Sequence, residues 1–345
     1  MGIDTKKYDI HIGNMKRGER NAITDVKGVK VGHVTLRDGD ARTGVTAIVP
    51  CEGNVFQNKV MAATHVINGF GKSIGLVQID ELGTMETPII MTNTLSVGTA
   101  ATALVKHMLK ENGDIGLTTG TVNPVVCECN DGRLNMIREL YVKEEHVFEA
   151  LEKASSDFEE GNVGAGTGMV CYGLKGGIGT ASRVVTLDGQ EYTLGALVLS
   201  NFGTGERLTV DGKKVGKMIK AMNEEDKGSI IIILATDAPV NERQLKRLCK
   251  RVPAGLARTG SYYGNGSGDI AFAFTTANRV PHYSDTDIMN MKMLHDDKIN
   301  GLFEAVVESV EEAVISSLLH STETVGRDGY TAKSLADYME KLGEI

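Results

Sequence analysis

The chain of 345 residues lacks the features that would take it into or across a membrane. Its N-terminal segment contains no apolar stretch of the kind that forms a signal peptide. Lys6 stands where N-myristoylation requires Ser or Thr. No segment approaches the run of about 18 apolar residues that predicts a membrane-spanning helix. We therefore expect no membrane partner.

Cysteine is scarce, and no long basic run is present. The five cysteines are scattered and odd in number, which fits a reduced cytoplasm better than a disulfide framework. A net charge of −8 without a basic run argues against a nucleic-acid partner. Cys127 and Cys129 have no partner cysteine or histidine at the spacing of a zinc site. We expect a cytoplasmic protein without a metal.

Glycine, by contrast, is abundant: the chain has 41 glycines and only 6 prolines. The glycines follow no fixed period, which indicates many tight turns and close approaches of backbone segments. The 41% hydrophobic content can build a sizeable core without disulfide or metal cross-links. No linker, repeat or low-complexity segment divides the sequence. We predict a single domain over residues 1–345.

Predicted strands and helices occur in groups and do not alternate one for one, which favours α+β layers over a doubly wound fold. The helix over 300–319 has the clearest amphipathic pattern, and Pro253 is expected to interrupt the helix over 239–258. Hydrophobic periodicity predicts paired strands within 23–34, further strands at 43–50, 86–92, 166–172, 193–200, 228–236 and 270–276, and helices at 99–112, 143–155, 239–258, 300–319 and 331–343.

A small-residue turn, Gly264-Asn265-Gly266-Ser267-Gly268-Asp269, precedes the predicted strand at 270–276. Turns collect Gly, Asn and Ser for backbone reasons, and on these residues alone a simple turn is the favoured interpretation. The alternative is chemical. If the Gly266–Ser267 bond breaks, Ser267 gains a free α-amino group beside its own hydroxyl, so that one residue holds both base and nucleophile.

Two polar positions suggest how a substrate would be held. Glu128 and Asp131 flank Asn130 in a loop that can be read as an Asn-Asp-Gly turn, but a loop carboxylate is also what a cationic amine substrate requires. Asn201 ends an apolar strand. Such an asparagine is commonly a turn former, although a rigid strand end can also direct its side-chain amide at an oxyanion.

Three further segments, at 321–323, 68–73 and 175–180, contain polar or glycine-rich patterns. Ser321 and Glu323 follow the helix over 300–319, as a plain loop or as a hydroxyl and carboxylate that orient a catalytic group. Residues 68–73 imitate the end of a phosphate-binding loop, but Val66 replaces its first glycine. Residues 175–180 are expected to form a tight turn under a neighbouring active site. No histidine accompanies a nucleophile elbow, which argues against a hydrolase triad.

Each of these signals is weak alone, but as an ordered set they resemble the L-aminopeptidase/D-esterase and β-peptidyl aminopeptidase family of self-processing serine peptidases. The resemblance runs in register from about residue 20 to about residue 330. It rests on motifs at 28–35 (GVKVGHVT), 86–98 (ETPI and TNTLSVG), 128–132, 164–169 (GAGTGM), 175–180 (KGGIGT), 235–239 (ATDAP) and 265–269 (NGSGD).

The resemblance implies an α+β fold of four layers, an αββα sandwich like that of N-terminal-nucleophile hydrolases but with its own connectivity. It also implies self-cleavage into an α chain (1–266) and a β chain (267–345), assembly as a tetramer of αβ units, and no cofactor. Residue by residue it implies a nucleophile (Ser267), an oxyanion donor (Asn201), a pair that positions and activates the nucleophile (Ser321 and Glu323), a carboxylate for the substrate's amino group (Glu128) and a substrate-binding position at which some relatives carry tyrosine (Asn130).

The predicted function is a serine aminopeptidase or amidase that releases N-terminal amino acids from short peptides, amides or esters through an acyl-enzyme on Ser267. An acyltransferase like the ornithine acetyltransferases is the nearest alternative, and Ser267 argues against it because those enzymes cleave at threonine. A non-catalytic oligomeric scaffold is a second alternative. The presence of Ser267, Asn201 and Glu128 argues against the scaffold.

Overall fold

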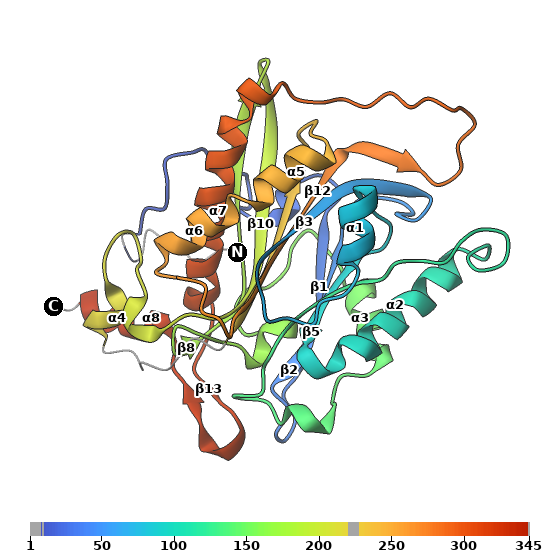
Figure 1. Ribbon diagram of the computed structural model, residues 1–345. Helices are drawn as coiled ribbons and strands as arrows, with labels where there is room; N and C mark the ends of the chain where they lie inside the picture. Colours follow the sequence, from blue (N-terminus) through green and yellow to red (C-terminus); the bar gives the residue numbers. More distant parts are fainter. Residues whose placement is uncertain (1–7, 9, 220–227, 344–345) are drawn as a thin grey trace.

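The computed structural model describes residue 8 and residues 10–219 and 228–343. Two β-sheets pack face to face, and each sheet carries helices on its outer face (Figure 1). This is the four-layer αββα arrangement that the family resemblance implies. Within the described residues, no helix is long and apolar enough to cross a bilayer.

The larger sheet has six strands, and its middle contains the strand that follows Ser267. Strands β11 and β12 are parallel, whereas every other neighbouring pair is antiparallel. In spatial order the strands are β4 (Thr84–Met85), β3 (Asn58–Gly69), β12 (Gly268–Pro281), β11 (Ser229–Thr236), β10 (Gln190–Asn201) and β9 (Gly177–Leu187).

The smaller sheet has four strands, of which the last two are parallel. In spatial order they are β1 (Lys30–Leu36), β2 (Thr43–Val49), β5 (Ile89–Asn93) and β6 (Val125–Cys129). Two short hairpins complete the β-structure: β7 (Val170–Cys171) with β8 (Leu174–Lys175), and β13 (Thr324–Val325) with β14 (Thr331–Ala332).

Helices cover both outer faces (Figure 1). The smaller sheet is covered by α2 (Val97–Glu111) and α3 (Glu144–Glu152), and the larger sheet by α5 (Glu242–Cys249), α6 (Val252–Arg258) and α7 (Asn300–Leu319). Three further helices lie at the periphery of these layers: α1 (Leu76–Leu82), α4 (Val215–Met218) and α8 (Leu335–Gly343).

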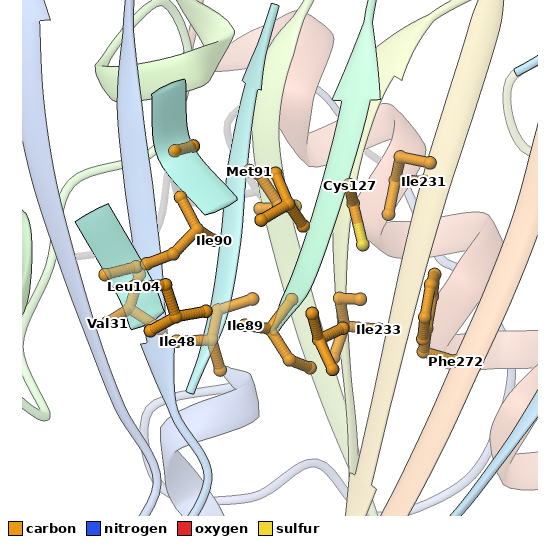
Figure 2. Packing of buried hydrophobic residues seen from close by; sticks show 14 of the residues in the cluster. Val31, Ile48, Ile89, Ile90, Met91, Leu104, Cys127, Ile231, Ile233 and Phe272 are labelled. Atoms are coloured by element: carbon orange, nitrogen blue, oxygen red, sulfur yellow. The ribbon is translucent and has the colours of Figure 1, made fainter. Parts of the chain in front are cut away.

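Strand β11 shows why both faces of the larger sheet are covered. Its residues are apolar on both faces, as expected of a strand between two layers. Ile231 and Ile233 join the core between the two sheets, whereas the alternate residues Ile230 and Ile232 join the core under α5, α6 and α7. Figure 2 shows Ile231 and Ile233 on the side of the smaller sheet, near Cys127 and Met91.

Two of the segments predicted as strands form 3-10 turns instead. Residues 164–168 form a 3-10 turn, which takes up the first three residues of the predicted strand 166–172. Its glycines allow close backbone approach: a Cβ on Gly168 would stand 2.0 Å from the Arg42 carbonyl oxygen. Residues 23–25 also form a 3-10 turn, so β1 pairs with β2 and not with the segment before it.

The long C-terminal helix is confirmed at its predicted bounds, but it is not simply amphipathic. Helix α7 is buried on most of its surface, because β9 and β10 cover one side and α6, α8 and the N-terminal segment cover the rest. The predicted helix over 239–258 is divided into α5 and α6. The division falls at residues 250–251, just before Pro253, whose ring fits the first turn of α6.

Candidate active site

The turn before β12 is held rigidly on both sides of the Gly266–Ser267 bond. Ser267 N–H donates to the Gly264 carbonyl oxygen at 2.9 Å, which closes a four-residue turn. The side-chain amide of Asn68, near the end of β3, donates to the carbonyl oxygens of Gly264 at 3.1 Å and Asn265 at 3.2 Å, and also to that of Ser267. These contacts fix the carbonyl groups around the bond that the sequence predicts to be cut.

The hydroxyl of Ser267 is fully buried and has a carboxylate partner. Ser267 Oγ donates to Asp269 Oδ1 at 2.6 Å. Ser267 immediately precedes β12 and Asp269 is the second residue of that strand. In extended chain, residues two positions apart project from the same face. Asp269 has no role among the residues predicted from the sequence, although its spacing from Ser267 was a signal that could have identified it.

Asn201 lies at the same end of the larger sheet as Ser267. It ends β10 and pairs with Ser229 of β11, which in turn pairs with Gly268 of β12. Two strand spacings of about 4.8 Å therefore separate Asn201 from the start of β12. Its Oδ1 accepts from Val170 N–H at 2.9 Å. This bond fixes the orientation of the amide, so that its NH₂ group is the end available as a donor.

Glu128 comes from the other sheet, near the end of β6, and its carboxylate is buried. Oε1 accepts from the Lys72 backbone N–H at 2.8 Å, and Oε2 accepts from the Thr94 hydroxyl. A Cβ added to Gly71 would stand 3.6 Å from Glu128 Oε1 and 3.8 Å from Gly268 Cα. The segment around Gly71 thus fills the space between the acidic group and the residue after Ser267.

Asn130 connects the two sheets through its backbone. Its carbonyl oxygen accepts from Asn201 Nδ2 at 3.1 Å, while its exposed side chain accepts from Gly132 N–H at 2.9 Å in a local turn. Cys129 Sγ makes a second link between the sheets, to the Leu199 carbonyl oxygen at 3.6 Å. The described structure therefore gathers Ser267, Asn201, Glu128 and the Asn130 backbone at one end of the sandwich.

Ser321 and Glu323 follow α7, and the hydrogen bonds of Ser321 go to backbone carbonyl oxygens and not to Ser267. The buried Ser321 hydroxyl is shared between the carbonyl oxygens of Gly176 at 2.9 Å and Ser317 at 2.8 Å. Glu323 is exposed. The partner that the structure gives to the Ser267 hydroxyl is Asp269. The roles of Ser321 and Glu323 stay predictions.

Peptidase family S58 matches residues 21–332. The chain belongs to this family. The beta-peptidyl aminopeptidase BapA of Sphingosinicella microcystinivorans is 40% identical over 347 residues, which cover 93% of this chain and 86% of that protein. The match confirms the family resemblance that the ordered motifs predict.

Solved structures confirm the fold of this S58 peptidase. The PH0078 protein of Pyrococcus horikoshii OT3 is 54% identical, with a TM-score of 0.95 over 100% of this chain and 98% of that one. The L-aminopeptidase D-Ala-esterase/amidase of Ochrobactrum anthropi is 37% identical, with a TM-score of 0.92 over 98% and 97% of the two chains. That enzyme is described as a prototype for the serine aminopeptidases and as a new variant of the N-terminal-nucleophile hydrolase fold.

Buried titratable groups adjoin the candidate site residues Glu128 and Asn130 in the chain. Burial raises the pKa of Asp131 to about 7, against the opposing effect of hydrogen bonds from Thr43 and Asn135. Burial and the Glu128 charge raise the pKa values of Cys127 and Cys129 well above the ordinary range, so both are neutral thiols. Among the described residues, no group of three or more His, Cys, Asp and Glu could hold a metal ion.

A separate cavity of about 850 Å³ lies where α2 and α3 meet the end of β2. Its lining includes Cys51, His107, Met108 and Phe148, and it contains none of the predicted site residues. The candidate active site is therefore assigned to the sheet ends, where the predicted polar residues converge, and not to this cavity.

Proposed function

We propose that this S58 peptidase is a serine aminopeptidase and amidase that matures by cutting its own Gly266–Ser267 bond. The observation that carries the proposal is the buried Ser267 hydroxyl, 2.6 Å from Asp269, in a turn whose carbonyl groups are held by Asn68. The names of the relatives support it, since they are beta-peptidyl aminopeptidases and an L-aminopeptidase D-Ala-esterase/amidase.

Maturation begins when Ser267 Oγ attacks the Gly266 carbonyl carbon and the hydroxyl proton passes to Asp269, its hydrogen-bond partner. The Gly266–Ser267 C–N bond then breaks, and its nitrogen takes a proton to become the α-amine of Ser267. An ester between Gly266 and Ser267 Oγ results. Water hydrolyses this ester, leaving a Gly266 carboxylate and a free Ser267.

In turnover, the same hydroxyl attacks the carbonyl carbon of a substrate. Its proton passes to the Ser267 α-amine, or to the predicted Ser321 and Glu323 pair, and then to the leaving amine. The Asn201 NH₂ group stabilises the tetrahedral oxyanion, and loss of such a donor typically costs about 3 kcal/mol in the barrier. Water then hydrolyses the acyl ester and restores the serine.

Glu128 binds the substrate's N-terminal ammonium group and thereby makes the enzyme an aminopeptidase. Its carboxylate is buried, comes from the opposite sheet, and is held by Lys72 N–H and the Thr94 hydroxyl. Asn130 lies beside it and contributes to the same substrate site. A cytoplasmic location and assembly as a tetramer of αβ units complete the proposal. The location rests on the scattered cysteines of the sequence, and the tetramer rests on the family resemblance.

The test combines Ser267→Ala with wild type on a denaturing gel and in an assay of aminoacyl p-nitroanilides. Wild type should give two bands and hydrolyse the substrate. Ser267→Ala should stay as one band of 37.0 kDa and lose activity, because it has neither the attacking oxygen nor the means to cut the chain.

Ser309→Ala is the matched control, because it also removes the hydroxyl of a buried serine. Ser309 lies on α7 beside Glu308, whose carboxylate contacts the N-terminal segment and not the candidate site. It should be cut and active like wild type. A wild-type protein that remains one intact band while it hydrolyses aminoacyl amides would refute self-processing. A cut protein without any amidase activity would refute the enzymatic assignment.

A further inference from the structure

Lys175, on β8, is a fully buried lysine whose ammonium group is surrounded by backbone oxygens. Nζ donates to the carbonyl oxygens of Gly166 at 2.9 Å, Met169 at 2.9 Å and Gly176 at 2.6 Å. From the sequence, this lysine was expected only to belong to a tight turn under the active site. Its three contacts tie the 3-10 turn at 164–168 to the hairpin of β7 and β8.

The contact geometry also fixes the charge of Lys175. Burial and the nearby charge of Arg37 lower its pKa well below the ordinary range. A neutral amine, however, has only two N–H groups, whereas three carbonyl oxygens, which can only accept, lie within hydrogen-bond distance. Satisfying all three requires the ammonium form. The nearby Asp131 also favours that form once it has lost its proton.

A single peptide group joins this ammonium to the predicted oxyanion donor. The Met169 carbonyl oxygen accepts from Lys175, and the N–H of the same peptide belongs to Val170, which donates to Asn201 Oδ1 at 2.9 Å. Hydrogen bonds in such a chain polarise one another. Positive charge at Lys175 therefore draws electron density from the Asn201 amide and makes its NH₂ group a stronger donor.

We propose that Lys175 is a positioning residue that acts on catalysis through the Met169–Val170 peptide, by orienting and polarising the Asn201 side-chain amide. This inference rests on the proposed function, in which Asn201 stabilises the oxyanion. It also gives Ser321 a place near the reaction, since the Ser321 hydroxyl and Lys175 Nζ both bind the Gly176 carbonyl oxygen.

The test is a double-mutant cycle of Lys175→Met and Asn201→Ala, assayed with an aminoacyl p-nitroanilide and normalised to the fraction of cut chain. Asn201→Ala should lower kcat by about 10²- to 10³-fold. Lys175→Met should lower kcat about tenfold, a smaller loss because the donor itself remains, and leave KM unchanged. The double variant should be no slower than Asn201→Ala alone, because both changes act on one donor.

Two further measurements keep the test decisive if Lys175→Met does not fold. Replacing Val170 by its α-hydroxy acid turns the Met169–Val170 peptide into an ester and removes only its N–H. This ester variant should have a lower kcat and an unchanged KM. Lys59→Met, at a mostly buried lysine paired with Glu86, is the control and should keep wild-type kcat. An aminoacyl aldehyde, which forms an oxyanion on Ser267, should also bind the ester variant more weakly than wild type.

The outcomes separate this inference from the proposed function. An inactive wild type refutes the proposed function, and an active Asn201→Ala refutes the oxyanion role. If wild type is active and Asn201→Ala is impaired, two results overturn the role of Lys175. The first is a wild-type kcat in the folded Lys175→Met protein or in the ester variant. The second is a double variant in which the separate kcat losses of Lys175→Met and Asn201→Ala multiply.

Discussion

Ser267 immediately precedes β12, and its hydroxyl donates to Asp269, the second residue of that strand. In the proposed self-cleavage, this bond would give the uncut chain a proton acceptor before the α-amine exists. The position of Ser267 could be predicted from its turn and from the ordered family motifs. The contact with Asp269 could also have been predicted, because side chains two positions apart in a strand lie on the same face. The contacts of Asn68 were not, since about 200 residues separate it from the turn that it holds.

Asp131, next to Asn130, makes stability depend on pH in a direction that can be tested. Burial raises its pKa to about 7, whereas an unfolded aspartate titrates at about 3.9. Between these values the folded chain keeps a proton that the unfolded chain has lost. The free energy of unfolding should therefore fall as pH rises from about 4 to about 7, by at most about 1.4 kcal/mol per pH unit.

Asp131→Asn removes this titration while keeping an oxygen for the bond from Asn135. Thermal unfolding of both proteins from pH 5 to pH 8 is the measurement. The variant should gain stability relative to wild type as pH rises toward 7, and the difference should level off above that value. Parallel curves over the whole interval would show that Asp131 does not titrate there.

At the scale of elements, the sequence predicted strands where apolar residues are dense and failed where polar residues mix with them. Strand β11 and helix α7 have long apolar patterns and were found. Strand β3 (Asn58–Gly69) was missed, because His65 and Asn68 interrupt its pattern and its pairing with β12 is a tertiary property. With β3 missed, the segment after it, around Gly71, could not be placed in the site.

That segment gives the prediction at this scale, with Gly71→Ala. A methyl group there would stand 3.3 Å from Ile270 Cδ1, 3.6 Å from Glu128 Oε1 and 3.8 Å from Gly268 Cα. It would fit after a small shift of the Ile270 side chain, and it would narrow the space between Glu128 and the residue after Ser267. KM for aminoacyl p-nitroanilides should rise about tenfold, or about 1.4 kcal/mol. Self-cleavage should keep its rate, because it needs no substrate ammonium.

Gly98→Ala on α2 is the matched control, since a Cβ there meets nothing within 4 Å. It should leave KM unchanged and stabilise the helix slightly. Equal slowing of self-cleavage and of substrate hydrolysis in Gly71→Ala would instead mean that the turn before β12 has moved, and the predicted role of the segment would be wrong.

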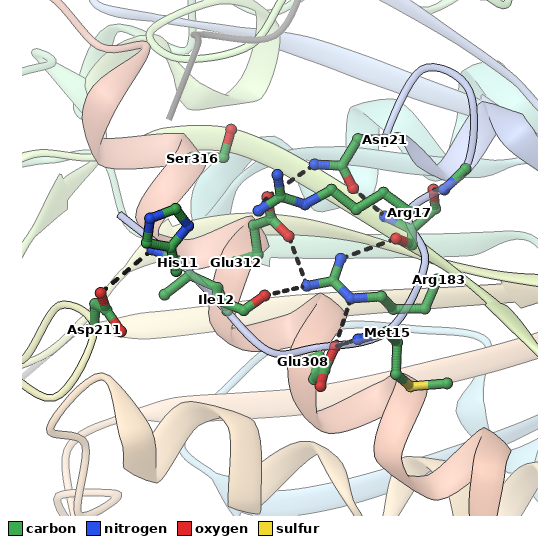
Figure 3. A network of polar contacts seen from close by, with 12 residues as sticks. His11, Ile12, Met15, Arg17, Asn21, Arg183, Asp211, Glu308, Glu312 and Ser316 are labelled. Atoms are coloured by element: carbon green, nitrogen blue, oxygen red, sulfur yellow. Dashed lines mark hydrogen bonds and ion pairs between the residues drawn. The ribbon is translucent and has the colours of Figure 1, made fainter. Parts of the chain in front are cut away.

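At the scale of the whole molecule, the proposed cut leaves β12 and α7 in one chain and their neighbours in the other. Figure 3 shows one group of contacts that would then join the two chains. Arg183 of β9 is fully buried and pairs with Glu308 and Glu312 of α7, each at 2.7 Å. Burial raises the pKa of Glu308, but bonds from Arg183 and from two backbone N–H groups of the N-terminal segment more than offset it and hold it below its ordinary value.

Removing one member of a buried ion pair leaves its partner charged and unpaired, which typically costs 3–5 kcal/mol. We expect Arg183→Met to lower the free energy of unfolding by about 3 kcal/mol or more, measured by urea unfolding. Lys16→Met breaks an exposed pair with Glu191 and should cost at most about 1 kcal/mol.

In the uncut Ser267→Ala background, the urea midpoint should not depend on protein concentration. In the cut protein it should rise with concentration, because unfolding separates two chains. A cut protein whose midpoint is the same at every concentration would mean that the chains remain joined when unfolded, and a stable Arg183→Met would show that this network does not hold them together.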